Sequence, residues 1–242
     1  MSAIFEQADQ TQVTEWYNWV FGLTNQKNPF HPIDGGQFWN VNNTNQNLIW
    51  LAGVTASTQP ANKPSQITDV NAIVQGSEAK VVYNGGNGDA EQNLPAVKPR
   101  EITINKGDNR NLYIPVSTEI ATATKYPKLQ DNLAELAQKI TDREDVKGAP
   151  PAFVEFQNSQ GEVHSLSGGE LKKTGFRVNG TIDQLTVHED DVFMLPSGKG
   201  PAAFSDYVVI LKRNALTQGK NTLRFGVNGQ FFAYTVEYTI SA

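Results

Sequence analysis

The chain has 242 residues, 38% of them hydrophobic, with 20 glycines, 12 prolines and a formal net charge of -5. No cluster of lysine or arginine is visible, which argues against nucleic-acid binding through a basic face and against attachment to anionic membranes. Cysteine is absent, so disulfides, thiolate metal sites and cysteine nucleophiles are excluded. A chain of this length can bury a sizeable core without covalent links, and no convincing linker divides it, so we expect a single domain over residues 1–242.

The beginning of the chain, MSAIFEQADQ, has neither the basic region nor the apolar region of a signal peptide. No stretch approaches the roughly 18 apolar residues of a membrane-spanning helix. The sequence as written therefore predicts a cytoplasmic protein without a membrane span, and export would follow if a leader had been removed.

Two accessory helices are predicted from the spacing of apolar residues. Over residues 8–23 these recur at intervals of three and four, the period of an amphipathic helix. Trp16 and Trp19 project from one broad face, which we expect to cover the open end of a β-sandwich; the alternative is a pair that stacks on carbohydrate. Over residues 127–144 a stripe of leucine, alanine and isoleucine, opened by Pro127, predicts the second helix.

The remaining segments are predicted to be short strands separated by turns. An irregular loop is expected at 28–46, a proline-broken loop at 57–65 and an exposed Gly/Asn loop at 84–93. Pro115 indicates an edge or a bulge in its strand, and such an edge could pair between chains to form an oligomer. Strands are expected at 47–55, 79–83, 100–104, 112–116, 152–156, 163–166, 175–178, 182–187 and 204–212.

The last predicted element is a hairpin over residues 221–240, with Asn228-Gly229 at its turn. Asn-Gly suits the two central positions of a type I′ turn. In the second arm apolar side chains alternate with mostly polar ones, the apolar set being Phe232, Tyr234, Val236, Tyr238 and Ile240. Arg177, Arg213 and Arg224 lie within or at the ends of predicted strands, and we expect them to pair across strands with Glu237 or Glu155 rather than to bind a ligand. Regularly spaced strands and turns predict an all-β fold, an antiparallel β-sandwich of jelly-roll type.

The first functional hypothesis is a non-catalytic binding or structural module whose partner is a small glycan or a protein. Sandwiches often present loops and aromatic side chains to such partners, which is an analogy at the level of the fold. The candidate ligand-binding residues are Trp16, Trp39, Trp50 and Tyr207.

The second hypothesis is a hydrolase or lyase with Glu15, Glu119 and Asp206 as acid and base residues. Glu119 follows an apolar strand and Glu15 lies on the tryptophan-rich helix. If both point inward they form a carboxylate pair among aromatic rings, as in glycosidases, where burial would raise a carboxyl pKa. The simpler interpretation is that each carboxylate pairs locally, with a nearby arginine or with Lys125.

The sequence implies no cofactor, apart from one segment whose side chains suit a metal ion. His188, Asp190 and Asp191 lie in a dense polar segment, with Asp206 as a further candidate ligand. Oxygen ligands this close together suit Ca²⁺, but the segment lacks the spacing of an EF-hand loop. An acidic, solvated turn is the simpler interpretation.

Six segments occur in a specific order along the chain: the tryptophan-rich EWYNWVFGL (15–23), NLIWLAGVT (47–55), REITINKGDNRNLYIPVSTE (100–119), VEFQNSQGEV (154–163), LTVHEDDVFMLPSGKGPAAFSDYVVIL (185–211) and the closing LTQGKNTLRFGV (216–227). In this order they resemble the pattern of a largely uncharacterised, often exported bacterial β-sandwich family. The resemblance implies a β-sandwich and no particular activity. The chain lacks the leader and the cysteines often found in that family, and Tyr207 directly follows Asp206 where the family pattern has glycine.

Overall fold

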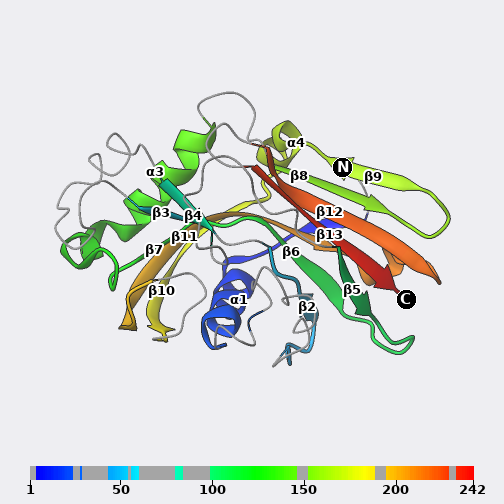
Figure 1. The fold of residues 1–242 in the computed structure, drawn as a ribbon, viewed down its shortest axis with the longest axis horizontal. Helices are drawn as coiled ribbons and strands as arrows, with labels where there is room; N and C mark the ends of the chain where they lie inside the picture. The colour runs from blue at the N-terminus through cyan, green and yellow to red at the C-terminus, as the bar shows by residue number, and fades with distance from the viewer. Residues whose placement is uncertain are drawn as a thin grey trace.

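The computed structural model describes residues 4–23, 28, 43–53, 56–59, 80–83, 99–145, 152–188, 195–228 and 233–242. Within this part of the chain most residues in regular structure are in strands, which form a six-stranded, a five-stranded and a two-stranded sheet. The two larger sheets face each other through a common hydrophobic core (Figure 1). The prediction of a mainly β fold is confirmed, and the two facing sheets are consistent with a sandwich.

The six-stranded sheet is arranged around one long strand, β11 (Gly198–Leu211). Two strands flank its first half and two flank its second half, all antiparallel to it. The first pair is β10 (Arg177–Val187) and β7 (Ile120–Thr122); the second is β1 (Phe5–Gln7) and β6 (Asn111–Ser117). The sixth strand, β2 (Leu48–Trp50), pairs with β6 in parallel.

The five-stranded sheet contains the C-terminal hairpin at its centre, in the order β5-β13-β12-β8-β9. Its strands are β5 (Arg100–Thr103), β8 (Ala152–Gln157), β9 (Val163–Leu166), β12 (Lys220–Asn228) and β13 (Ala233–Ser241). Because β5 runs parallel to β13, and β2 parallel to β6, the expectation of purely antiparallel sheets is wrong. The jelly-roll connectivity stays a prediction.

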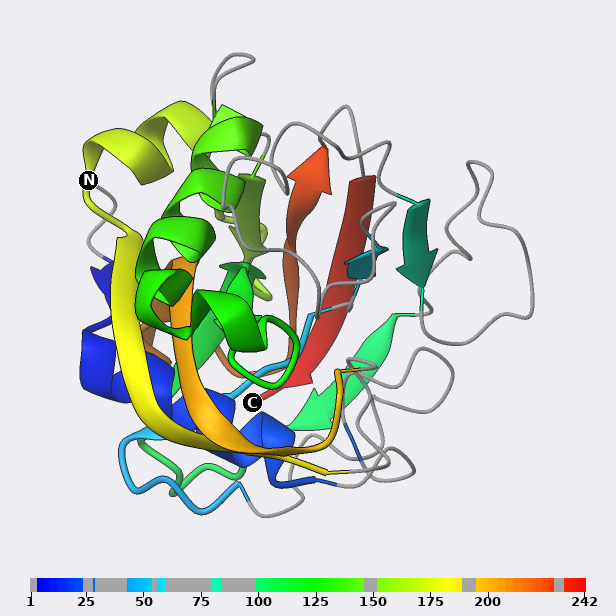
Figure 2. The same cartoon turned by 90° about the vertical axis from the view of Figure 1, so that its left-hand side faces the viewer.

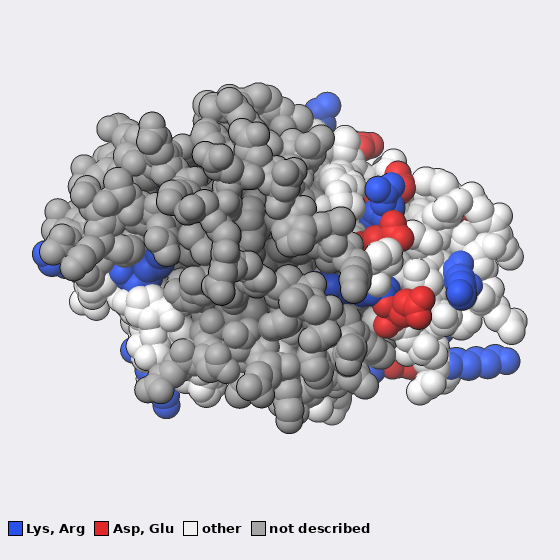
Figure 3. Space-filling view, in the orientation of Figure 1, with Lys and Arg blue, Asp and Glu red and all other residues white. Residues whose placement is uncertain are grey.

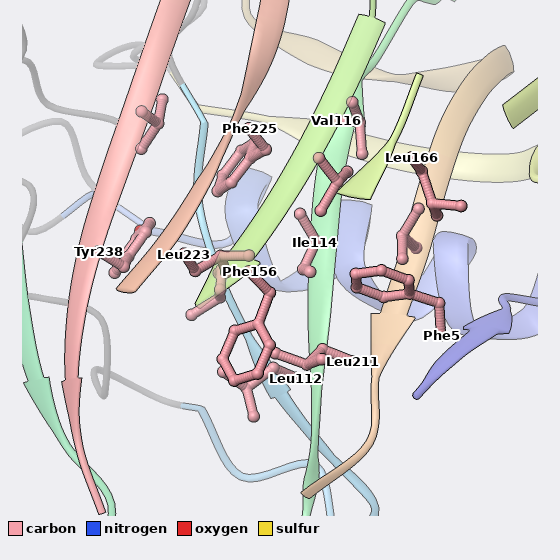
Figure 4. Packing of buried hydrophobic residues seen from close by; sticks show 14 of the residues in the cluster. Phe5, Leu112, Ile114, Val116, Phe156, Leu166, Leu211, Leu223, Phe225 and Tyr238 are labelled. Atoms are coloured by element: carbon pink, nitrogen blue, oxygen red, sulfur yellow. The ribbon is translucent and has the colours of Figure 1, made fainter. Parts of the chain in front are cut away.

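The core between the sheets forms because each contributing strand alternates its side chains between two faces. On β11, Val209 and Leu211 point into this core, whereas Val208 and Ile210 point to the opposite face of the sheet. Figure 4 shows side chains of β6 and β11 meeting side chains of β8, β12 and β13, with Phe156 and Phe225 among them.

The first predicted helix is α1 (Gln10–Phe21), and a capping box of Asp9 and Gln12 begins it. It covers the face of the six-stranded sheet that points away from the sandwich core, beneath the sheets in Figure 1. The expectation that it closes the open end of the sandwich is therefore wrong. Since β11 is covered on both faces, all residues from Ala202 to Leu211 are buried.

The second predicted helix is α3 (Leu133–Asp145), preceded by a 3-10 turn, η4 (Pro127–Asn132). It packs on the first half of β11 and on β7, where Leu133 and Leu136 lie in a cluster with Ala203 (Figure 2). Both helix predictions are confirmed. Two short helical segments were not predicted: α4 (Gly168–Lys173) and η5 (Arg213–Ala215).

The observed strand pairing corrects three predictions about individual strands and turns. Val227 pairs with Tyr234 and Asn228 with Ala233, so the hairpin connection spans 229–232 and is not a two-residue type I′ turn. The segment at 112–116 is an edge only in its later part: β2 pairs with β6 as far as Tyr113, whereas the described pairing of Pro115 is with Val208 of β11 alone.

The remaining correction concerns a predicted loop. Residues at the start of the expected 57–65 loop form β3 (Ala56–Gln59), which pairs with β4 (Lys80–Tyr83). Proline later in that segment predicted irregular structure, but it does not affect the residues that pair before it. The expected strand at 79–83 is confirmed by β4.

Candidate functional site

The Asp206 carboxyl group lies between α1 and the six-stranded sheet, and it is completely buried. Its Oδ1 atom accepts a hydrogen bond of 3.0 Å from the Tyr17 hydroxyl and one of 2.8 Å from the backbone N–H of Glu119. The first bond joins the helix to β11, and the second joins β11 to the segment between β6 and β7. Asp206 therefore connects three elements that are far apart in the sequence.

The other oxygen of this carboxyl group, Oδ2, has no hydrogen-bond partner in the described part of the chain, and neither does the hydroxyl group of Tyr113. Burial raises the pKa of Asp206 well above its usual range, and the charge of Glu119 raises it further. Both hydrogen bonds act in the opposite direction because they favour the carboxylate. Burial also raises the pKa values of Tyr17 and Tyr113. Three buried acids with raised pKa values therefore lie close together beneath α1.

The three carboxylates of the enzyme hypothesis do not meet. Glu15 is exposed and accepts a hydrogen bond of 2.8 Å from the Asn45 side chain. Positions two apart on a helix project about 200° from each other, so Glu15 points away from the face of α1 that brings Tyr17 to Asp206. Glu119 reaches Asp206 with its backbone N–H.

The carboxylate of Glu119 also acts on Lys125. Its charge raises the pKa of Lys125 and opposes burial, the larger effect, which lowers it. The local pairing with Lys125 that the sequence suggested is thus consistent with the structure.

The described aromatic residues proposed for ligand binding are core residues. Trp16 is 0% exposed, stacks on Tyr113 at 5.6 Å between ring centroids, and donates its Nε1–H to the backbone oxygen of Leu51. Trp50 is buried against Trp19. Stacking of a sugar on these rings would require the helix to leave the sheet.

Tyr207 is also buried, and it lies in the core between the sheets. It therefore occupies the opposite face of β11 from Asp206, because neighbouring residues of a strand point to opposite faces. Trp39 lies outside the described residues.

The proposed metal site is described only at His188, whose side chain is exposed; Asp190 and Asp191 lie outside the described residues. In the part of the chain that the structure describes, no three His, Asp or Glu side chains are grouped so that they could hold a metal ion.

A shallow surface pocket of about 500 Å³ lies where the β5–β6 turn meets the end of β11. We call it the η5 pocket. It is lined by Glu6, Lys106, Asn109, Asn111, residues 212–214 and Leu216. Two hydrogen bonds, each between a backbone group and a side chain, join the β5–β6 turn to the segment after β11. The Arg213 N–H donates to Asn111 Oδ1 at 2.9 Å, and Arg213 Nε donates to the Asp108 carbonyl at 2.8 Å. The buried Leu216 anchors this frame in the sandwich core.

Several donors that line the η5 pocket are not used inside the protein. The Lys106 ammonium group and the side-chain amides of Asn109 and Asn214 make no hydrogen bond or ion pair within the described residues, and all three side chains are exposed. Of the Arg213 guanidinium group, Nε is engaged at Asp108, and its two terminal nitrogens are not bonded to any described residue. The pocket therefore presents converging, unused donors on a fixed frame.

Sequence reasoning did not find this pocket, although its two segments are visible as polar runs, KGDNRN (106–111) and KRN (212–214). Each run reads as an ordinary turn. The two runs meet because β6 and β11 pair in antiparallel orientation with Leu112 opposite Leu211, which places both runs at the same end of the sheet.

The outer face of the five-stranded sheet shows a different distribution of charge. Arg224 lies between Glu155, at 3.6 Å, and Glu237, at 3.4 Å, which confirms the predicted cross-strand pairing for this arginine. For the other two arginines the prediction is wrong: Arg177 pairs with Asp142 of α3, and Arg213 donates to the Asp108 carbonyl. In Figure 3 the described part of the surface shows acidic and basic side chains next to one another on this side. Because the charges are paired there, this face is a less suitable ligand site than the η5 pocket.

Comparisons with protein-family models, with curated proteins and with solved structures gave no match to this chain. No helix in the described part of the chain has the length and apolar character needed to cross a lipid bilayer.

Proposed function

We propose that this protein is a non-catalytic binding module that holds a small glycan in the η5 pocket. The observation that carries the proposal is the convergence of unused side-chain donors on one pocket of about 500 Å³. Pockets for small molecules generally have volumes between about 300 and 1,000 Å³. The hydroxyl groups of a sugar both donate and accept hydrogen bonds, and side-chain amides can match them in both directions.

The fixed frame of the pocket supports binding. Asn111 and Arg213 are tied to each other across the two segments, so their positions are set before a ligand arrives. A site held in advance loses less conformational entropy when it binds. Leu216 supplies the apolar part of the lining, and recognition would therefore depend mainly on hydrogen bonds.

The enzyme hypothesis has less support from the arrangement of its residues. An acid or base must come within hydrogen-bond reach of the substrate, but Asp206 is sealed beneath α1 and Glu15 lies elsewhere on that helix. The raised pKa of Asp206 is accounted for by its place in the core.

Binding can be tested by NMR titration of the ¹⁵N-labelled protein with a panel of mono- and disaccharides. We expect the amide signals of residues 106–111 and 212–216 to shift, and the Asn109→Ala and Asn214→Ala variants to bind at least threefold more weakly. These side chains are exposed, so the variants should keep the fold. Shifts confined to other parts of the protein, or no shift with any saccharide, would refute the proposal.

A further inference from the structure

The η5 pocket has a surplus of positive charge on a chain whose net charge is -5. Its lining contains three cations, Lys106, Lys212 and Arg213, and one acid, Glu6. Three positive charges less one negative charge leave a surplus of two. In an acidic protein such a surplus attracts anions to one place on the surface.

The nearby acids are already engaged by other cations. Glu6 Oε1 contacts Lys212 Nζ at 3.0 Å. Asp108, next to the pocket, accepts hydrogen bonds from Arg110 Nε at 3.0 Å and from Arg110 Nη2 at 2.7 Å. These two pairs leave Lys106 and the terminal nitrogens of Arg213 as the charged donors that bond no carboxylate among the described residues, although the charge of Arg213 also lowers the pKa of Asp108.

The geometry of these two cations indicates the chemistry of a ligand. A guanidinium group presents its nitrogens as a planar fork that matches two oxygens of a carboxylate or a sulfate group, and an ammonium group contributes a compact charge. The Nε–H bond to the Asp108 carbonyl fixes the orientation of the guanidinium plane.

We propose that the η5 pocket recognises an acidic saccharide, whose carboxylate or sulfate group binds between Lys106 and Arg213. This inference rests on the proposed function and specifies its ligand class. The amides of Asn109 and Asn214 then contact the hydroxyl groups of the same sugar. Because the charges lie at the surface, the affinity falls as the salt concentration rises.

The test compares galacturonic acid, its uncharged methyl ester, galactose 6-sulfate and inorganic sulfate as ligands in NMR titrations at low salt. We expect galacturonic acid or galactose 6-sulfate to bind about tenfold more tightly than the methyl ester, a difference that corresponds to one charge-assisted contact. The tighter of the two acids identifies the anionic group.

Two variants locate the effect. Lys106→Gln should weaken binding of the acidic sugar about tenfold and leave the methyl ester unchanged. Lys199→Gln is the matched control: Lys199 is an exposed lysine near the first residue of β11, and the pocket lies beyond the last. It should leave both affinities unchanged.

The outcomes separate the two proposals. Equal binding of acid and ester, with no effect of Lys106→Gln, would overturn the acidic-ligand inference and leave glycan binding standing. Binding of inorganic sulfate without binding of any saccharide would support an anion site and refute the glycan. Failure of every probe to shift residues 106–111 or 212–216 would refute both.

Discussion

Replacement of Asp206 by asparagine should change how the stability of the protein depends on pH. Burial raises the pKa of Asp206 well above its ordinary value. Between the unfolded-state pKa, about 3.9, and the folded-state pKa, the folded protein keeps this proton while the unfolded chain releases it. The folded state then binds more protons, so this group makes the free energy of unfolding fall as the pH rises, and the loss is complete above the folded-state pKa.

The slope of this dependence follows from the proton count alone. One proton retained only in the folded state lowers the free energy of unfolding by about 1.4 kcal/mol for each pH unit within that window. Asp206→Asn has no proton to retain, and its amide oxygen can still accept the bonds from Tyr17 and from the Glu119 N–H. The stability of the variant relative to the wild type should therefore rise with pH from the unfolded-state pKa, about 3.9, up to the folded-state pKa, with a limiting slope of about 1.4 kcal/mol per pH unit.

Urea-induced unfolding at a series of pH values from about pH 4 upwards, followed by tryptophan fluorescence, measures this difference. Asp183→Asn is the control, because it removes an exposed carboxylate of β10; the wild-type dependence on pH should persist in it. Parallel stability profiles for wild type and Asp206→Asn across the whole series would refute the raised pKa of Asp206 in the folded state.

Three further substitutions test the packing around the sheets, each by urea unfolding at neutral pH. Arg100→Gln should lower stability by about 2–4 kcal/mol, because the buried guanidinium donates to two backbone carbonyls after β2 and to the Tyr238 hydroxyl; a loss below about 0.5 kcal/mol would contradict this role. Gly180→Ala should lower stability by about 1–3 kcal/mol, since its Cβ would lie 2.5 Å from the ring of the buried Phe204; an unchanged midpoint would show that the ring can move. Asn221→Ala should lower stability by about 2–3 kcal/mol, because this fully buried side-chain amide bonds the backbone of Thr217, before β12, and of Ile240, on β13; unchanged stability would refute that dependence.

The spacing of apolar residues was sufficient to predict elements that have one apolar face, and to predict that this face is buried. In β13 the alternation predicted that Val236, Tyr238 and Ile240 are buried, and they are. The apolar stripe of residues 127–144 predicted α3, whose Leu133 and Leu136 are buried. In both cases one face of the element is apolar, and the hydrophobic effect requires only that something cover it.

The spacing of apolar residues cannot predict which other element packs on the apolar face. The aromatic face of α1 was expected at the end of a sandwich, but it lies on the outer face of the six-stranded sheet. The parallel pairs β2–β6 and β5–β13 likewise depend on partners that are distant in the sequence. Many different pairings would bury the same apolar faces, and their relative energies depend on the packing of the whole molecule.

The candidate sites show the same division. The sequence suggested Asp206 as an acid or base residue and Tyr207 as a ligand-binding residue, and it contained the runs at 106–111 and 212–214 that line much of the η5 pocket. The tertiary structure was needed to show that Asp206 lies under α1 and that Tyr207 lies in the core on the other face of β11. It was also needed to show that the two runs meet at one end of the sheet. The composition of a segment fixes which atoms can donate, accept or carry charge, whereas the pairing of β6 with β11 decides which of those atoms share one pocket.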